Sequence, residues 1–277
     1  MIIESESLAN HFWRDLWSFW RDLWSYRELF FVLAWRDISV RYKQTIIGML
    51  WAILRPFLTM VVFTVIFGKL GGFPSEAGAP YALLVFAGLL PWSLFATSVA
   101  DAGNSLIGNS NLISKVYFPR LIIPAAAIVT SLVDFLISLF VLIDLMVWYQ
   151  YVPGWAFLLL PAFTMMAAAA ALGAGLYISS MTAKYRDFRF IIPFALQLGL
   201  YVSPVGYSSN IVPESWRLVF SLNPLVGIID GFRWCILRGQ EAFNWQSVLI
   251  SAAVIALMLW FGVRQFRSNE DTLADVI

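Results

Sequence analysis

The chain has 277 residues, of which 60% are hydrophobic and only 13% are charged. One soluble core of that length cannot bury so much apolar surface, so the composition predicts a protein that uses lipid as its solvent. The net charge of +1 excludes the basic excess typical of nucleic-acid-binding proteins. A single cysteine, Cys235, and a single histidine, His11, are too few for a zinc site or a disulfide framework.

A heptad that occurs twice is the first recognisable element. Residues 12–18 and residues 19–25 both read FWRDLWS. On a helix, the Phe, Trp and Leu positions fill an arc of roughly 160°, and the polar positions fill the rest. The alternative is a coiled-coil or core-packing helix, but so many tryptophans suit the membrane–water boundary better. We therefore predict an interfacial amphipathic helix that lies flat on the membrane.

Six apolar segments follow, each close to the roughly 20 residues that a helix needs to cross about 30 Å of hydrocarbon. They are residues 48–68, 81–103, 121–148, 155–181, 190–207 and 247–263. Residues 208–244 are also apolar, but prolines and glycines interrupt them, which favours two short re-entrant or surface helices. The expected fold class is an all-α integral membrane protein with six transmembrane helices.

The basic residues predict the orientation in the membrane. Most of them precede the first segment, lie in the second and fourth connections, or follow the last segment. By the positive-inside rule, both termini face the cytoplasm. The exceptions are Lys69 and three arginines in the interrupted stretch, Arg217, Arg233 and Arg238. These three arginines lie either in a translocated loop or inside the protein, and the sequence leaves both places open. We expect a cytoplasmic amino-terminal region at 1–46, a transmembrane domain at 47–265 and a cytoplasmic tail at 266–277.

Nothing in the sequence predicts catalysis. No segment matches the P-loop pattern, and the single histidine leaves no base for a nucleophile. Asp101, Asp134 and Asp144 are candidates for proton or ion coupling because they fall in apolar segments. The stronger expectation is structural: Asp101 and Asp144 lie near segment ends, and a neighbouring polar group can satisfy Asp134.

Short motifs that occur in order resemble the membrane subunit of ABC-2-type exporters. The first are Arg36-Asp37, Arg41-Tyr42, Gly48, Trp51 and Arg55-Pro56. Residues 203–208 (SPVGYS), 212–214 (VPE), 222–225 (LNPL), 230–234 (DGFRW) and the tail residues Phe266, Glu270, Ala274, Asp275 and Ile277 resemble the branch that exports O-antigen, capsule and teichoic-acid chains. The resemblance runs from about Arg27 to the last residue. The tryptophan heptads are not assigned to the family pattern, although an amphipathic amino-terminal helix is typical of the family.

The resemblance implies a homodimer of six-span subunits around a continuous channel in the bacterial cytoplasmic (inner) membrane. Two copies of a separate cytoplasmic ATP-binding subunit would drive it and would bind ATP and Mg. Residues 108–119 occupy the place of the loop that docks on that ATPase. Asn109, Ser110 and Asn111 suit the cap of a short helix there. The contact residues expected in this loop are Asn111, Leu112, Ile113, Lys115, Val116, Tyr117 and Phe118; the alternative is an ordinary polar loop.

The resemblance also implies a polysaccharide substrate, carried on a polyprenyl pyrophosphate. Sugar rings stack on aromatic side chains, and the candidates for the channel or its outer gate are Trp92, Tyr201, Tyr207, Trp216 and Trp234. A basic cytoplasmic entrance would stabilise the pyrophosphate, and the candidates are Arg36, Arg41, Lys43 and Arg55. Anchoring by the positive-inside rule explains the first three equally well, but Arg55 lies too deep for that alone.

Two other functions stay open at this stage. An ABC-2 exporter of a small lipophilic drug or lipid would share the fold. A membrane enzyme acting on polyprenyl-linked sugars is less favoured, because it needs clustered carboxylates that the spacing of the acids does not offer.

Overall fold

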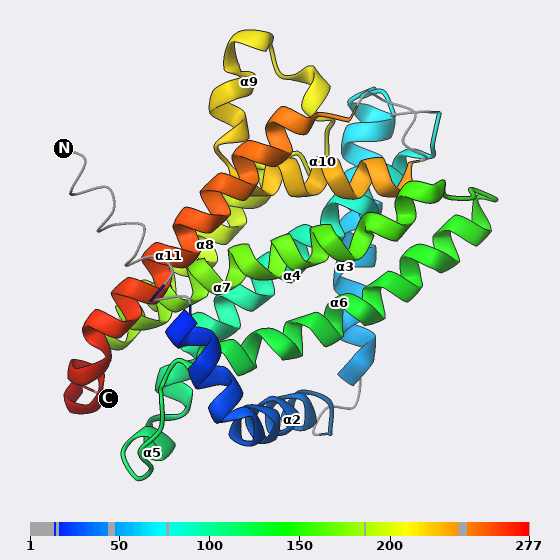
Figure 1. Cartoon of the computed structure of the whole chain (residues 1–277). Coiled ribbons are helices and arrows are strands. Elements are labelled where there is room, and N and C mark those ends of the chain that lie inside the picture. The colour runs from blue at the N-terminus through cyan, green and yellow to red at the C-terminus, as the bar shows by residue number, and fades with distance from the viewer. Residues whose placement is uncertain are drawn as a thin grey trace.

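The structure, a computed structural model, describes residues 14, 17–43, 48–75, 78–185, 187–237 and 243–276. These residues form helices joined by short connections, with no strand among them (Figure 1). The elements are α2 (Arg27–Lys43), α3 (Gly48–Phe63), the π-helix η1 (Thr64–Leu70), α4 (Tyr81–Gly108), α5 (Ser110–Ile113), α6 (Ile122–Trp148), η2 (Trp155–Leu159), α7 (Leu160–Lys184), α8 (Phe188–Val202), η3 (Ser209–Ile211), α9 (Glu214–Ser221), α10 (Pro224–Ile236) and α11 (Trp245–Val276).

Five helical stretches within the described residues are long and apolar enough to cross a membrane. They are Leu50–Leu70, Tyr81–Gly108, Ile122–Trp148, Trp155–Lys184 and Trp245–Glu270. They correspond to five of the six expected segments, which confirms the prediction of an all-α membrane protein. A sixth span results if the bent pair α9–α10 is counted as one.

The expected fifth segment, 190–207, is shorter than predicted. Its helix, α8, has 15 residues and ends at Val202. At 1.5 Å per residue it is about 22 Å long, short of the roughly 30 Å of hydrocarbon. The cause is Pro204, because a proline pushes the preceding residue out of the helical region. Ser203 is accordingly extended, with φ −82° and ψ 150°.

The interrupted stretch after α8 forms two short helices, as predicted. Helices α9 and α10 meet at an angle of 104°. The bend falls where Asn223 caps α10: its side chain accepts a hydrogen bond from the Leu225 N–H at 3.0 Å, and Pro224 takes the first helical position. Of the residues expected here, Arg238 lies outside the described part of the chain.

Helix α4 lies in the middle of the bundle and buries most of its amino-terminal half. Beside it, α7 and α11 approach at glycines. A Cβ added to Gly262 of α11 would lie 2.2 Å from the main-chain oxygen of Gly173 of α7. Small residues allow such close helix contacts in membranes, where burial of apolar surface supplies little drive for association.

The described part of the heptad repeat differs from a helix with one apolar face toward lipid. Residues 17–25 are helical, with Phe19 buried against the protein and Trp17, Trp20 and Trp24 exposed. Asp22 accepts a hydrogen bond from Arg267 of α11 at 2.9 Å. The aromatic residues are therefore divided between a docking face and an exposed stripe, because the protein covers one side. The position on the membrane surface stays a prediction.

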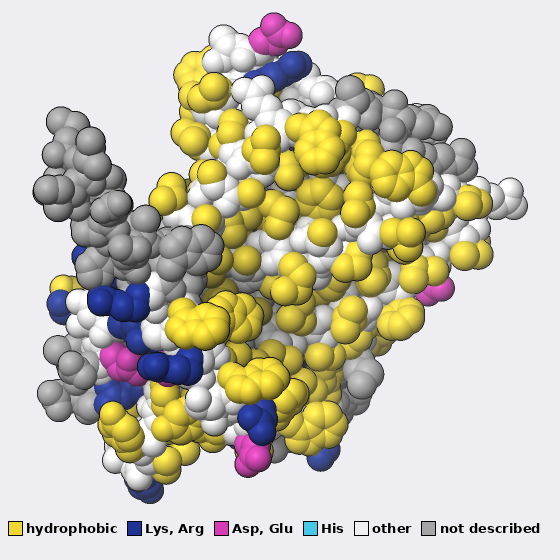
Figure 2. All heavy atoms as spheres, in the orientation of Figure 1, with side chains coloured by type: hydrophobic (Ala, Val, Ile, Leu, Met, Phe, Trp, Pro, Cys, Tyr) yellow, Lys and Arg dark blue, Asp and Glu magenta, His cyan; other side chains and the backbone are white. Residues whose placement is uncertain are grey.

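The two ends of the bundle differ in composition. In Figure 1, the helix 17–25, α2, α5 and the carboxyl end of α11 lie together at the lower left, here called the α5 end. Helix α9 and the amino end of α11 lie at the opposite, α9 end. Figure 2 shows hydrophobic side chains over the face between them and most of the visible Lys and Arg side chains at the α5 end. The basic residues thus gather at one end, as the positive-inside argument requires, while the orientation itself stays a prediction.

Candidate functional site

A cleft of about 630 Å³ opens between α2, α3, α4, α6 and α8. Aromatic and aliphatic side chains form most of its wall, with hydroxyl groups of Thr59, Ser93 and Thr97 among them. Four charged residues line it as well: Arg41, Arg55, Asp101 and Asp134. An apolar wall with a few convergent polar groups is typical of a binding site.

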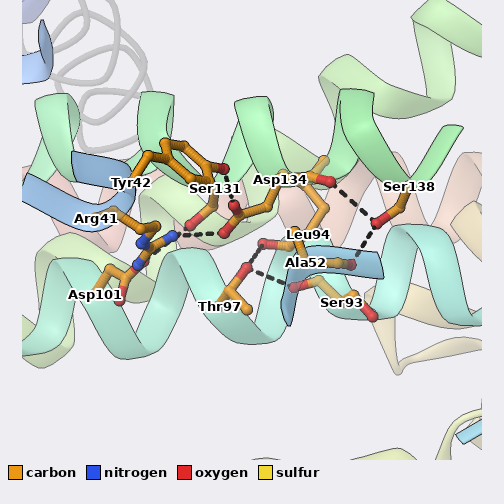
Figure 3. Close-up of polar contacts among 10 residues, drawn as sticks. All are labelled: Arg41, Tyr42, Ala52, Ser93, Leu94, Thr97, Asp101, Ser131, Asp134 and Ser138. Carbon is orange, nitrogen blue, oxygen red and sulfur yellow. Dashed lines mark hydrogen bonds and ion pairs between the residues drawn. The ribbon is translucent and has the colours of Figure 1, made fainter. Parts of the chain in front are cut away.

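A cluster of charges lies within this cleft (Figure 3). Arg41, in the last turn of α2, donates from one terminal nitrogen to Asp101 of α4 and from the other to Asp134 of α6, each at 2.5 Å. The neighbouring Tyr42 hydroxyl donates to the second oxygen of Asp134. Ser131 donates to Asp101 at 3.1 Å. One cation therefore joins three helices.

Burial and the carboxylate charges act in opposite directions on the pKa of Arg41 but in the same direction on that of Tyr42. Burial by itself would lower the pKa of Arg41, but the carboxylates of Asp101 and Asp134 outweigh it and raise that pKa. Burial and the hydrogen bond to Asp134 raise the pKa of the Tyr42 phenol. Arg41 stays charged and Tyr42 stays neutral at physiological pH.

The three intramembrane carboxylates differ in their surroundings. Asp134 is satisfied by neighbouring polar groups, as predicted. Asp101 does not lie at a helix end, because α4 continues to Gly108, and it is satisfied by Arg41 and Ser131 instead of by solvent. Asp144 is exposed in the last two turns of α6, near the end of its segment as expected.

The structure separates the four entrance candidates. Arg41 and Arg55 line the cleft, and both terminal nitrogens of Arg41 bind carboxylates. The Arg55 side chain is exposed within the first span. Arg36 pairs with Asp37 and donates to the side-chain oxygen of Asn109 at 2.7 Å, and Lys43 is exposed; neither of these two lines the cleft. A role in binding pyrophosphate stays a prediction for all four.

The aromatic candidates are also divided. Trp92 lines the cleft, and its ring lies so close to α8 that a Cβ added to Gly199 would approach it to 2.7 Å. Tyr201 and Trp216 are exposed, and Trp234 packs edge-on against Trp155, with 5.6 Å between ring centroids. The Tyr207 hydroxyl donates to the Val202 carbonyl at 2.9 Å. Of these five aromatic candidates, Trp92 alone lines the cleft of the single chain.

A buried arginine that the sequence did not identify as a site residue holds the turn after α8. Arg233 of α10 is 2% exposed and donates to the main-chain oxygens of Leu84, Val205 and Tyr207 at 2.8–3.3 Å. It therefore lies inside the protein, one of the two places that the sequence had left open. The earlier signals were its place in the 230–234 motif and its departure from the positive-inside pattern.

Other contacts fix the same turn, residues 203–208. Tyr81 of α4 donates to the Gly206 carbonyl, and Asn223 donates to Ser203 at 3.0 Å. Two of the motifs quoted above, SPVGYS and DGFRW, thus meet in space. The second motif supplies the donor, Arg233, and the first supplies two of the main-chain carbonyls that accept from it.

The connection between α4 and α6 contains the short helix α5, as expected, but not with the expected cap. Asn109 caps no N–H with its side chain; that amide donates to the Ser105 carbonyl and accepts from Arg36. Ile113 and Phe118 are buried against Phe19 and Phe266. They are therefore not available as contact residues, because they belong to this chain's own core.

The surface that this connection presents is consequently smaller than predicted. Its exposed residues include Asn111, Lys115, Val116 and Tyr117, while Leu112 is half-buried. The Tyr117 side chain is 96% exposed. Behind it, Glu270 of α11 accepts a hydrogen bond from the Arg120 N–H at 3.0 Å, which fixes the end of the connection.

Comparison with known proteins identifies the family. The family model of ABC-2 type transporters matches residues 28–237. An O-antigen export system permease protein RfbA of Myxococcus xanthus is 29% identical over 255 residues, which cover 91% of this chain and 96% of the relative. A protein of the same name from Klebsiella pneumoniae is 26% identical over 90% of this chain and 95% of its own length.

A more limited match extends the comparison beyond the O-antigen permeases. The inner membrane transport permease YadH of Escherichia coli K12 is 27% identical over 195 residues, which cover 66% of this chain and 74% of the relative. The relatives are permeases, which fits a transporter subunit better than an enzyme. This chain is a multi-pass membrane protein that belongs to the ABC-2 type transporter family.

Proposed function

We propose that the chain is the permease subunit of an ATP-driven exporter that moves an O-antigen-type polysaccharide across the bacterial inner membrane. The observation that carries this proposal is the match to O-antigen export permeases along nearly the whole length of both chains. The polymer would travel on a polyprenyl pyrophosphate. Both termini, and with them the α5 end, would face the cytoplasm, because the basic residues gather there.

The channel would form when two copies of the chain bring their clefts together. Arg55 supports this arrangement, since its exposed side chain lies within a span. A charge within a membrane helix is costly when it faces hydrocarbon, so such residues usually face water-filled cavities or protein. A dimer around a wet channel meets that requirement. Trp92 and the hydroxyl groups of the cleft would then offer sugar rings weak, repeated contacts.

Energy would come from two copies of a cytoplasmic ATP-binding subunit, which would hold the ATP and Mg. The support is the exposed end of the α4–α6 connection. Tyr117 is 96% exposed beside Lys115 and Val116, although the same connection is anchored from behind by buried Phe118. A rigid base with an exposed apolar tip suits docking on a partner.

A clean deletion of the gene tests the substrate. Cells that lack the permease should keep finished polymer on the cytoplasmic side and lose it from the surface, and expression of the intact chain from a plasmid should restore export. Normal surface polysaccharide in the deletion strain would contradict the assignment.

Reconstituted vesicles separate this function from the two alternatives. The purified chain with its ATP-binding subunit should pass long glycans when ATP is present. Transport of a small lipophilic compound without any glycan would favour the drug or lipid exporter. Transfer of sugars by the chain alone, without the ATP-binding subunit, would favour the enzyme.

A further inference from the structure

Arg41 lies where three parts of the molecule meet. It belongs to α2, which precedes the first span, and its partners Asp101 and Asp134 lie on α4 and α6. These two helices flank the α4–α6 connection, which would dock on the ATP-binding subunit. The same three residues line the cleft. Arg41 is thus in contact both with the helices that a docked partner would move and with the wall of the proposed pathway.

Further hydrogen bonds attach α2 to the same two helices. Tyr42 adds a second bond from α2 to Asp134, and Arg36 donates to Asn109 at the start of the connection at 2.7 Å. Along α4, Asp101 and Asn109 are eight residues apart, or about two helical turns. Helix α2 is therefore bonded to α4 at Asp101, to the start of the connection at Asn109 and to α6 at Asp134, so it has to follow when these elements shift.

The charges of this cluster depend on one another. Each carboxylate obtains its cation from the same guanidinium, so loss of Arg41 leaves two acids in a partly buried cleft without that cation. Removing one member of a buried charge group is far more damaging than removing the whole group, because the remaining charges lose their compensation. Comparing the loss of Arg41 alone with the loss of all three charges therefore distinguishes a positioning role from direct contact with a transported molecule.

We propose that Arg41 is a positioning residue, which binds α2 to α4 and α6 so that movement of the docking connection reshapes the cleft, and that it is not a ligand of the transported polymer. The proposal deepens the proposed function and rests on it for the ATP-binding partner. Among the described residues that line the cleft, Arg55 is the second cation, and it is the one that we assign to contact with the substrate.

The test uses the complete permease with its ATP-binding subunit in vesicles. The variants are Arg41→Gln, Arg41→Lys and the neutral triple Arg41→Gln/Asp101→Asn/Asp134→Asn, with Arg27→Gln as the matched loss of an exposed arginine from the same helix. Every complex, the otherwise unmodified one included, carries the reporter Ala96→Cys, which places a thiol in the cleft wall, in a Cys235→Ser background. Two quantities are measured: the rate of maleimide labelling with and without ATP, and the polymer exported per ATP hydrolysed.

In the unmodified complex and in Arg27→Gln, ATP should change the labelling rate at least threefold. Arg41→Gln should lose that response and about tenfold of the polymer exported per ATP, with the amount of assembled complex unchanged. Arg41→Lys should give intermediate values of both quantities, because an ammonium group lacks the planar fork with which Arg41 reaches the two carboxylates. The triple variant should regain most of both quantities, because the amide that replaces Arg41 can still hydrogen-bond to the amides that replace the two carboxylates, so α2 stays attached and no charge is left uncompensated.

Three results would overturn the proposal. The triple variant could regain the labelling response but not export, which would make the guanidinium a ligand of the polymer. It could regain neither, so that compensation of charge is not the reason. Arg41→Gln could keep wild-type values per assembled complex and merely reduce its amount, which would leave a purely structural residue.

A failure of the proposed function can be distinguished from a failure of the proposal for Arg41. An unmodified complex that shows the ATP-dependent labelling but exports no glycan would contradict the substrate. The labelling comparison among the variants would then still decide the role of Arg41. If Arg41→Gln does not assemble, Arg41→Lys and the triple variant carry the same comparison.

Discussion

Two arginines hold opposite ends of the molecule by different chemistry. Arg41, at the α5 end, is partly exposed and binds the carboxylates of Asp101 and Asp134. Arg233, toward the α9 end, is 2% exposed and donates to three main-chain carbonyls. Side-chain charges can be neutralised one at a time, whereas carbonyl positions are set by the path of the backbone. The α5 end is therefore adjustable through charge, and the α9 end is fixed by shape.

The largest effect is expected from a substitution toward the α9 end, at Arg233. Arg233→Met should lower the free energy of unfolding by about 5 kcal/mol, because each carbonyl that loses its donor costs roughly 1–3 kcal/mol. The thermal unfolding midpoint of the purified protein in detergent measures it. Arg233→Lys is the control and should recover only part of the loss, since an ammonium group lacks the planar fork. A midpoint unchanged in Arg233→Met would remove the contrast between the ends.

The next largest effect compares the buried and the exposed side of the α4–α6 connection at the α5 end. Phe118 is 5% exposed, so Phe118→Ala should lower stability by about 3 kcal/mol through the cavity left behind. Tyr117 is 96% exposed, so Tyr117→Ala should unfold like the wild type but retain less of the ATP-binding subunit on co-purification. Equal co-purification of the wild type and Tyr117→Ala would show that the partner docks elsewhere.

A smaller effect is expected at the α5 end when the pH is raised. The pKa of Tyr42 is raised, so its hydrogen bond to Asp134 contributes fully below the unfolded value of about 10 and is lost as the pH rises through the folded value. The free energy of unfolding of the wild type should exceed that of Tyr42→Phe by about 1 kcal/mol, a value that allows for the partial exposure of the phenol. This difference in stability should shrink only above pH 10. Melting curves from pH 8 to 11 measure it, with Tyr117→Phe as the exposed control. A difference that does not depend on pH would contradict this account.

The smallest effect concerns the docked amino-terminal helix. Asp22 and Arg267 form a pair of 2.9 Å that is partly open to solvent. Asp22→Asn should therefore cost at most about 1 kcal/mol, and added salt should reduce the difference from wild type. Arg21→Gln, at an exposed neighbour, is the control. A loss as large as that of Phe118→Ala would mean that charge, not the burial of Phe19, holds this helix.

The fold followed from the sequence wherever lipid imposes length and polarity. Residues 121–148 had to be a helix because nothing else satisfies so long an apolar backbone in a bilayer. The end of α8 was placed five residues too far along, although Pro204 was present to indicate it. Counting apolar residues does not detect a change of backbone conformation.

The candidate site was less predictable, because it depends on partners far apart in sequence. Arg41 and Asp134 are 93 positions apart, and the sequence offered a separate reason to consider each of them, but nothing in it paired them. Likewise, Phe118 and Tyr117 are adjacent apolar residues of one loop, yet one is in the core and the other in solvent. Only the packing of Phe19 and Phe266 against the loop distinguishes them.

The contact between Gly173 and Gly262 restricts which sequences this architecture can use. A single methyl group at either position would collide with main-chain atoms of the other helix at under 3 Å. Compensation by a smaller neighbour is impossible, because no residue is smaller than glycine. Random mutagenesis of the chain should therefore return almost no functional substitutions at these two codons, while the exposed Gly108, with nothing within 4 Å of an added Cβ, should accept alanine freely.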